Sequence, residues 1–400
     1  MKIAVLADFH LGYVRFLDDS FEQAERAFSR ACEEAELVVL LGDIFDSRIP
    51  KQEILARSFK LFRNAFGKKW EAKLASYDSK DGRKNYAEVP VVAIHGTHER
   101  RTKELVNPIE LLEKAGFLVN VHAATAVFEK DGERIALQGM GGIPEEYAKS
   151  ALEALSPKPV DGAFNVFLFH QSMKEFLPGE SLMGMEDLPK GFDLYLCGHI
   201  HAKTIQKLDS GAYFIIPGST VVTQMRKEDV GGKGFFVFDT KSKEAVFREI
   251  QSRPFFFEEL EFKQASLEEV LAKARKGIEK LLENKTEVKP LIKLKLRGSM
   301  AKGLNQSNLD VSSIAGEFED RAIVEVDKDL ESETLKEKID KLRSLRESKL
   351  SVKDIGIEIL KNKLKQYGFK SDIDIETLYA LLSEEGKGSA EKTLKRILEM

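Results

Sequence analysis

The sequence has little of what marks a secreted or membrane-spanning protein. It holds only two cysteines, Cys32 and Cys197, so a disulfide framework is excluded and a reducing, cytosolic compartment is expected. It contains no uninterrupted apolar run of about 18 residues, so no membrane-spanning helix is expected. The chain reaches a carboxylate at Asp8 too early for the apolar segment of a signal peptide, so none is expected.

The chain also lacks an excess of positive charge. Its 62 Lys and Arg residues face 66 Asp and Glu residues, which gives a formal net charge of −4. This excludes a basic field over the whole surface, so any contact with nucleic acid has to come from a local patch or a bound metal. With 42% hydrophobic and 32% charged residues, the composition is that of a globular protein, and 400 residues allow roughly two to three domains.

Strand-like and helix-like runs alternate over the first 250 residues, which predicts an α/β fold. Helical spacing of apolar residues follows Ser20, which we expect to be the N-cap of the first helix. Residues 67–88 are polar and hold the only tryptophan, and we expect a surface insertion there with a short helix. Strands are predicted at 3–7, 37–41, 89–94, 125–128, 135–138, 166–169, 194–197, 213–216 and 234–238.

The composition shifts after residue 253. A helical stretch over 266–282 lies between an apolar run and strand-like segments at 291–296 and 322–326, which predicts a small α/β unit over 254–328. For the remaining residues, 329–400, the sequence predicts charged and amphipathic helices. We therefore expect three parts: 1–253, 254–328 and 329–400.

Six of the seven histidines lie at or just beyond the end of a strand-like run, the exception being His122. Two carboxylates, Asp8 and Asp43, occupy equivalent places. In open α/β sheets, the loops at the carboxyl ends of strands converge on one edge, where ligands bind. These side chains are therefore expected to meet. The six that we expect to ligate metal are Asp8, His10, Asp43, His170, His199 and His201.

The spacing of these residues has a chemical reason. Asp8 and His10 are two residues apart, as are His199 and His201, and an extended i, i+2 pair points both side chains the same way. A shell of imidazole and carboxylate without thiolate suits Mn, Fe or Zn. Six strong ligands are too many for one tetrahedral ion and suit two ions about 3.5–4 Å apart, with Asp43 as the expected bridge.

Other candidates have plainer interpretations. We expect His122, Cys32 and Cys197 to be structural, and His95 to support a ligand or the core. A basic run follows His98, and contact with a phosphate backbone and a solvated helix start explain it equally well. Its members are Arg100, Arg101 and Lys103.

The ordered set of motifs resembles the calcineurin-like metallophosphoesterases. Within them, Asp8-Phe9-His10-Leu11-Gly12 is similar to the double-strand-break repair nucleases of the SbcD and meiotic-recombination-eleven family. The motifs that carry the resemblance lie between residues 8 and 201. They are Asp8-x-His10, Gly42-Asp43-x-x-Asp46, Gly96-x-His98-Glu99, His170 and Gly198-His199-x-His201.

The resemblance implies a four-layer α-β-β-α sandwich with a small α/β cap domain and a C-terminal helical segment. It implies two manganese ions per chain that serve DNA phosphodiester cleavage, exonucleolytic, endonucleolytic or both. It also implies that His98 is catalytic and faces the scissile phosphate without binding metal. The shells implied are Asp8, His10, Asp43 and His201 for the first ion, and Asp43, His170 and His199 for the second.

This sequence departs from the family at two positions. Thr97 stands where the family usually has an asparagine whose carbonyl binds the second ion, which predicts a weaker second site. Asp46 stands where some members have a histidine, and we expect its carboxylate to orient a ligand.

By the same resemblance, the partners are DNA ends, a coiled-coil ABC-type repair ATPase similar to SbcC, and a second copy of the chain, with no membrane. The expected compartment is the cytoplasm, at the nucleoid. Two other hypotheses about the function stay open. The first is a small-molecule phosphatase or cyclic phosphodiesterase on the same metal core, and the second is a scaffold that only binds DNA ends. The additional residues after Arg253 argue against the first of these, and Thr97 is the only support for the second.

Overall fold

The computed structural model describes residues 1–332, except 88, 103, 104, 178 and 180–182. Beyond 332 it describes only residues 354, 356, 357, 360, 361, 375 and 379, so most of the predicted helical segment 329–400 lies outside the described residues. Its predicted start is wrong, because residues 329–332 belong to a strand that ends at Ser332. In the part of the chain that is described, no helix has both the length and the apolar character that crossing a bilayer requires.

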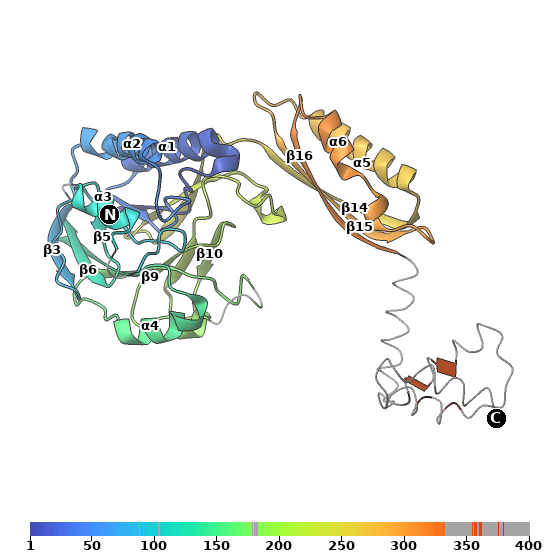
Figure 1. Cartoon of the computed structure of the whole chain (residues 1–400). Coiled ribbons are helices and arrows are strands. Elements are labelled where there is room, and N and C mark those ends of the chain that lie inside the picture. The colour runs from blue at the N-terminus through green and yellow to red at the C-terminus, as the bar shows by residue number, and fades with distance from the viewer. Residues whose placement is uncertain are drawn as a thin grey trace. The chain divides into compact units, whose positions relative to one another are not determined.

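Two β-sheets lie face to face in the first 250 residues (Figure 1). The first sheet has six strands in the order β13-β12-β1-β2-β4-β5. Its strands are β1 (Lys2–Leu6), β2 (Leu37–Leu40), β4 (Val91–Ala93), β5 (Val119–Asn120), β12 (Gly234–Asp239) and β13 (Glu244–Glu249).

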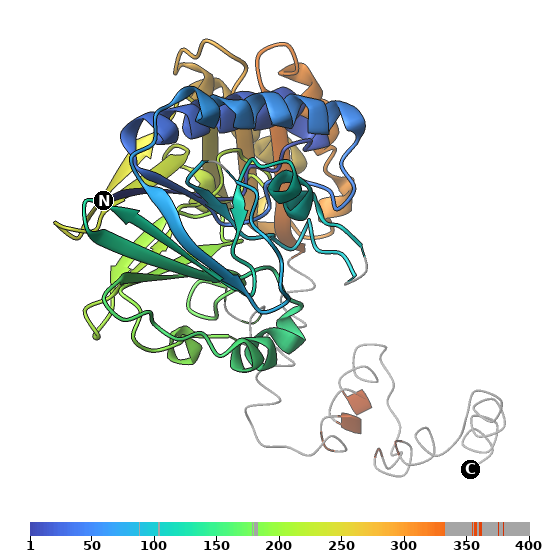
Figure 2. The same cartoon turned by 90° about the vertical axis from the view of Figure 1, so that its left-hand side faces the viewer.

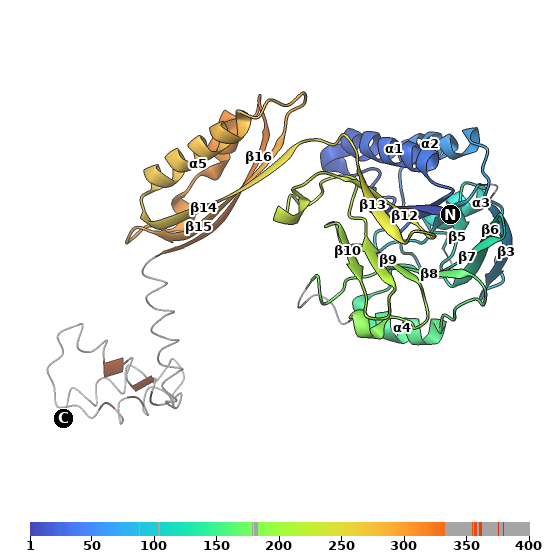
Figure 3. The ribbon, with the colours of Figure 1, turned by 180° about the vertical axis from the view of Figure 1, so that it is seen from behind.

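The second sheet has seven strands in the order β10-β11-β9-β8-β7-β6-β3. Figure 3 shows this sheet from behind, with β13 and β12 of the first sheet above it. Its strands are β3 (Lys73–Ser79), β6 (Ala124–Lys130), β7 (Glu133–Met140), β8 (Phe164–His170), β9 (Leu194–Gly198), β10 (Thr204–Lys207) and β11 (Tyr213–Ile216).

Helices cover the outer face of each sheet, so the predicted four-layer α-β-β-α sandwich is confirmed. The first sheet is covered by α1 (Leu17–Glu34), α2 (Gln52–Phe62) and α3 (Pro108–Lys114), and Figure 2 shows the blue helices α1 and α2 above the sheets. The second sheet is covered by α4 (Ala148–Leu155). One buried cluster fills each of the three spaces between layers.

Strand β1 shows why a continuous apolar run forms the centre of this sandwich. Ala4 and Leu6 lie in the cluster beneath the helices, whereas Ile3 and Val5 lie in the cluster between the sheets. Both faces of the strand are therefore buried, which is the reason an alternating polar pattern is missing. The prediction of a buried strand here is confirmed.

Parallel strands bring the predicted ligands to one edge of the sandwich. Strand β1 pairs in parallel with β2, and β2 with β4, in the first sheet. Strand β7 pairs in parallel with β8, and β8 with β9, in the second. The carboxyl ends of parallel strands share one edge, so the loops that follow β1, β2, β4, β8 and β9 meet there.

Two local predictions are wrong. Ser20 does not cap the first helix, because the 3-10 turn at Val14–Phe16 runs into α1, which begins at Leu17. The Ser20 hydroxyl lies inside the helix and donates to the Leu17 carbonyl oxygen at 2.7 Å. The segment 67–88 is not simply an insertion, because β3 forms there and pairs antiparallel with β6 at the edge of the second sheet.

Residues after 253 form a three-stranded sheet in the order β14-β15-β16 with two helices on one face (Figures 1 and 3). Its elements are β14 (Phe255–Ala265), α5 (Leu267–Leu282), β15 (Leu291–Met300), α6 (Val311–Glu317) and β16 (Ile323–Ser332). By contacts, residues 1–258, 276–294 and 315–326 form one compact unit, and the second comprises 259–275, 295–314 and the described residues from 327 onward. The domain limits at 253 and 328 stay a prediction.

Candidate metal centre

The loops that carry the predicted ligands have an unusual backbone. Asp8, His10, Asp43 and His199 all have positive φ angles, of 53°, 48°, 47° and 78°. A residue with a side chain in this left-handed region costs about 1–3 kcal/mol, and such residues gather at functional sites. Backbone hydrogen bonds hold the conformation: the Asp8 N–H donates to the Gly42 carbonyl at 3.1 Å, and the His10 N–H to the Asp43 carbonyl at 3.0 Å.

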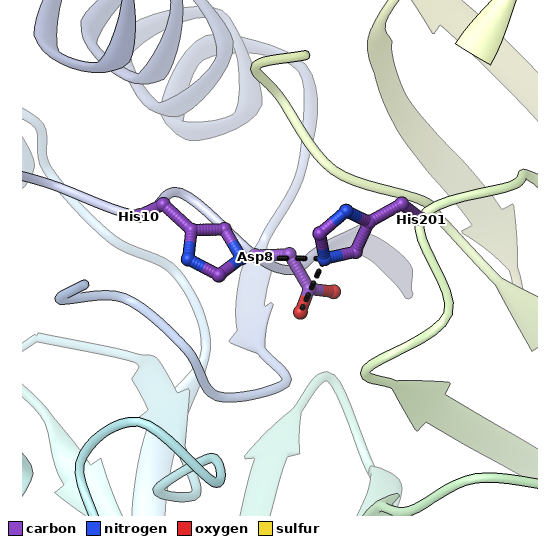
Figure 4. A group of neighbouring side chains, drawn as sticks. All are labelled: Asp8, His10 and His201. Atoms are coloured by element: carbon purple, nitrogen blue, oxygen red, sulfur yellow. Dashed lines mark hydrogen bonds and ion pairs between the residues drawn. The ribbon is translucent and has the colours of Figure 1, made fainter. Parts of the chain in front are cut away.

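Asp8, His10 and His201 form the first ligand cluster (Figure 4). Asp8 and His10 come from the loop after β1, and His201 comes from the segment after β9. The Nε2 atoms of the two histidines lie 3.2 Å apart, and His201 Nε2 lies 3.8 Å from Asp8 Oδ1. Asp8 Oδ1 is buried and has no hydrogen-bond partner among the described residues.

The other ring nitrogen of each histidine is already engaged. His10 Nδ1 lies 3.1 Å from Asp46 Oδ1, and His201 Nδ1 lies 2.9 Å from Thr223 Oγ1. Two Nε2 atoms and a bare carboxylate oxygen therefore face one another in a buried place. Buried lone pairs without partners are costly, and a cation between them removes that cost.

Asp43, His170 and His199 form the second ligand cluster. The His170 Nδ1–H donates to the Leu41 carbonyl oxygen at 2.6 Å. His170 Nε2 lies 3.1 Å from Asp43 Oδ2, yet it makes no hydrogen bond of normal geometry within the described structure. The His199 ring lies 5.2 Å from the His170 ring, centroid to centroid.

Burial and the neighbouring charges shift the pKa values of the residues in both clusters. Burial raises the pKa of Asp8 to about 6. Burial opposes the charged form of His170, but the Asp43 carboxylate prevails and raises the pKa of His170 to about 9. Burial likewise opposes ionisation of Asp43, but His170 holds its pKa well below the usual range. These shifts indicate that a protonated His170 faces an ionised Asp43 in the metal-free protein.

Glycines make room for Asp43. Its Oδ1 accepts from the His98 N–H at 2.8 Å, and its Oδ2 accepts from the Thr97 hydroxyl at 3.2 Å. A Cβ on Gly96 would lie only 2.1 Å from Asp43 Oδ1, so a glycine is required there. Asp43 belongs to the second cluster, and its predicted role as a bridge to a first ion stays a prediction.

His98 lies on the wall of the cavity that the clusters open into. The cavity has a volume of about 630 Å³ and is lined by His10, Asp43, His199 and His201 as well as His98. The His98 side chain is 44% exposed, and its ring lies 4.9 Å from the His10 ring. His98 Nδ1 lies 3.0 Å from the Asp46 carbonyl oxygen. Asp46 therefore orients both histidines, through its side chain for His10 and its backbone for His98.

The remaining histidines, the buried His95 and the half-buried His122, form a pair outside the two clusters. The rings of His95 and His122 lie 4.5 Å apart, and His122 Nδ1 accepts from the Gly141 N–H at 2.9 Å. Burial lowers the pKa of both imidazoles, to about 4 for His122. This fits the structural role expected of His122.

Cys32 and Cys197 are buried and form no disulfide, and burial raises the pKa of Cys32 to about 12. Arg101 donates to the Val106 carbonyl at 3.2 Å. Lys103 lies outside the described residues.

Three residues that support the site were not singled out as such from the sequence. Glu99 is buried and accepts from the Phe45 N–H at 2.9 Å and the Gly96 N–H at 2.8 Å, so it ties the loops after β2 and β4 together. The position of Glu99 directly after His98 in the sequence could have indicated that it supports the site. Thr223 and Lys233 lie on a segment far along the chain, and no spacing connects them to the metal motifs.

The donor set fits divalent metal ions. Each cluster offers three imidazole or carboxylate atoms that lie within 4.8 Å of one another, with no sulfur among them. Nitrogen and oxygen donors of this kind suit Mn, Fe or Zn. The orphaned Asp8 oxygen and the facing nitrogens support the same assignment.

Comparisons with known proteins agree with this geometry. The family model described as "Calcineurin-like phosphoesterase" matches residues 1–203 of the 400. The double-strand break repair protein MRE11 of Encephalitozoon cuniculi is 31% identical over 253 residues, which cover 56% of this chain and 43% of that protein. The DNA double-strand break repair protein Mre11 of Methanopyrus kandleri is 30% identical over 265 residues, which cover 60% of this chain and 54% of that protein.

A human relative extends the comparison. The double-strand break repair protein MRE11 of Homo sapiens is 26% identical over 309 residues, which cover 65% of this chain and 42% of that protein. The chain thus spans about half the length of the curated relatives it matches. The predicted resemblance is confirmed. With a family match over half its length, a four-layer sandwich, and metal-ligand clusters at the shared strand ends, this chain belongs to the calcineurin-like phosphoesterases.

Proposed function

We propose that this chain is a two-metal DNA nuclease that hydrolyses phosphodiester bonds at DNA ends in double-strand break repair, by exonucleolytic cleavage, endonucleolytic cleavage or both. One observation carries the proposal: two clusters of converging imidazole and carboxylate atoms open into a single cavity beside His98. Manganese is the proposed metal, with two ions per chain. The repair role is supported by the names of the MRE11 relatives.

Two bound divalent ions would supply charge that polarises the phosphoryl group and a water that ionises near neutral pH. Asp8, His10 and His201 would hold one ion, and Asp43, His170 and His199 the other. The left-handed backbone at four of these residues fixes the donors before substrate arrives.

His98 has a separate task. Its Nδ1 lies against the Asp46 carbonyl oxygen, which can only accept, so Nδ1 carries a proton and Nε2 remains for the substrate. In the charged imidazolium form, Nε2–H can donate to a phosphate oxygen and pass its proton to the leaving oxygen. The cavity and the 44% exposure of His98 allow that approach.

A small-molecule phosphatase or cyclic phosphodiesterase is the second candidate. The cavity has a volume of about 630 Å³, and small-molecule sites typically have about 300–1,000 Å³, so its size also suits a small phosphate ester. The two candidates share the metal clusters and differ in substrate.

Parallel assays separate these candidates. The full chain, with and without added Mn²⁺, is given linear and supercoiled DNA and, separately, p-nitrophenyl phosphate and a cyclic nucleotide. Mn²⁺-dependent DNA cleavage with slow monoester turnover supports the nuclease, and the reverse supports the second candidate. DNA binding without any hydrolysis would instead support a scaffold that only binds ends.

The partners proposed are a coiled-coil ABC-type repair ATPase and a second copy of this chain, in the cytoplasm at the nucleoid. We propose that the segment from 329 onward binds the ATPase, because its amphipathic sequence suits docking into a groove of a partner. Removing residues from 333 onward should leave a Mn²⁺-dependent enzyme, because every proposed ligand precedes residue 202. It should abolish capture of the ATPase, and unchanged capture would refute this assignment.

A further inference from the structure

One ligand of the first cluster has a partner from a distant part of the chain. Thr223 Oγ1 lies 2.9 Å from His201 Nδ1, and Thr223 is only 8% exposed. Among the described residues, no other side chain forms a hydrogen bond with this nitrogen, so the Thr223 hydroxyl is the group that can bias which ring nitrogen of His201 holds a proton.

The position of the proton on His201 decides which atom donates in this hydrogen bond. A hydroxyl can donate or accept, and so can a neutral imidazole, depending on its tautomer. His201 can bind a metal ion through Nε2 only when Nδ1 carries the proton. Thr223 Oγ1 then has to accept that proton in a hydrogen bond.

We propose that Thr223 is the positioning residue of the first metal site: its hydroxyl holds the His201 ring in the tautomer and orientation that present Nε2 to the ion. The proposal rests on the proposed function, because it needs a metal ion at Asp8, His10 and His201. It adds a residue that none of the metal motifs contains.

Thr223 can act in this way because its own position is fixed. The Tyr13 hydroxyl donates to the Thr223 carbonyl oxygen at 2.8 Å. Four residues earlier, Ser219 forms a parallel bridge with Ala7, the neighbour of Asp8. The segment that carries Thr223 is therefore joined to the loop that carries Asp8 and His10.

A buried ion pair closes the other end of the segment. Lys233 is 4% exposed, and its Nζ donates to Asp229 Oδ1 at 2.5 Å and to Ser219 Oγ at 3.0 Å. Asp229 also accepts from the Arg226 N–H at 2.9 Å. One buried ammonium thus holds the segment on both sides of Thr223, so this network keeps the Thr223 backbone beside His201.

Thr220 provides a matched comparison within the same segment. Its Oγ1 is also buried, but it has no hydrogen-bond partner in the described part of the chain. Replacing either threonine with valine removes one buried hydroxyl and keeps the shape of the side chain. Only the change at position 223 removes a contact to a proposed ligand.

The first test is calorimetric titration of Mn²⁺ into the metal-free full chain. Loss of a group that orients a ligand weakens metal binding by about 10–100-fold. We expect Thr223→Val to weaken one of two Mn²⁺ affinities by that factor and to leave the other within about threefold, since His201 belongs to only one cluster. Thr223→Ser should restore the affinity, and Thr220→Val should match the wild type.

The outcomes distinguish the two proposals. If the wild type binds no Mn²⁺, the proposed function fails. If the wild type binds two ions and Thr223→Val binds them equally well, the role of Thr223 is refuted and the proposed function stands. Equal weakening by Thr223→Val and Thr220→Val would also refute it, because a loss of packing would explain both.

A second measurement needs no variant to fold. In the wild type with ¹⁵N-labelled histidine and bound Zn²⁺, nuclear magnetic resonance should show His201 protonated on Nδ1 and bound to the metal through Nε2. Protonation of His201 on Nε2 in this sample would overturn the proposal. In Thr223→Val, we expect a mixture of tautomers, and in Thr223→Ser the wild-type form.

Discussion

Glu99 offers a quantitative test of how the ligand loops are held. It is fully buried, and its two carboxylate oxygens accept from the Phe45 and Gly96 N–H groups at 2.9 and 2.8 Å. Burial, followed by the charge of Asp43, raises its pKa from 4.5 to about 8, although the two N–H groups oppose this. The folded, metal-free protein therefore prefers Glu99 protonated.

The sign of the pH dependence follows from that shift. Between pH 4.5 and about 8, the folded chain binds a proton at Glu99 that the unfolded chain has lost. The contribution to stability is complete below pH 4.5 and is lost as the pH rises through about 8. The shift sets a ceiling of about 5 kcal/mol, and relaxation around the carboxylate should reduce the measured effect to roughly 2–4 kcal/mol.

Glu99→Gln cannot ionise and should lose this dependence. The assay is urea unfolding in a chelator at about pH 5 and about pH 8, followed by the fluorescence of Trp70. Trp70 is the only tryptophan, and it packs against the core beneath α1. Between these pH values, the free energy of unfolding should fall by roughly 2–3 kcal/mol more for the wild type than for Glu99→Gln.

Two further comparisons sharpen this test. Glu129→Gln changes an exposed glutamate of β6 and should keep the wild-type dependence. Asp8, whose pKa is also raised to about 6, contributes equally to the pH dependence of unfolding in the wild type and in Glu99→Gln. Its contribution therefore cancels when the two proteins are compared. Equal slopes for the wild type and Glu99→Gln would refute the reasoning, because Glu99 would then be ionised in the folded protein.

The other predictions concern the site and the thiols. His98→Leu should keep the Mn²⁺ stoichiometry and lower the hydrolysis rate by about 10²–10⁴-fold; loss of an ion by metal analysis would make His98 a ligand. Thr97→Asn should tighten the weaker Mn²⁺ affinity and raise activity at limiting metal, with little change at saturation; calorimetry showing no tightening would contradict this. Cys32 and Cys197 should resist iodoacetamide in the folded protein and react after denaturation, as followed by mass spectrometry, because burial raises the pKa of both thiols.

Much of the central sandwich could be predicted because its signal is local. The run Ile3–Ala7 is continuously apolar, as a strand buried on both faces has to be, and the ligands follow such runs directly. Asp8 and His10 do share one cluster, but the predicted reason is wrong, because both have positive φ angles and are not extended. The same spacing fails for His199 and His201, which lie in different clusters.

The errors arise where tertiary contacts decide. Strand β3 is polar and lies at a sheet edge, so only its pairing with β6 makes it a strand. Ser20 has the composition of a cap, but a preceding 3-10 turn starts α1 one turn earlier. The contact between Thr223 and His201 joins two segments that no spacing rule links, so the sequence carried no signal for it.

The central claim is that two metal ions lie side by side at the shared strand ends. Diffraction from crystals of the full chain soaked in Mn²⁺, recorded at the manganese absorption edge, tests it most directly. We predict two anomalous peaks per chain, one among Asp8, His10 and His201 and the other among Asp43, His170 and His199. A single peak, or peaks away from these side chains, would contradict the account.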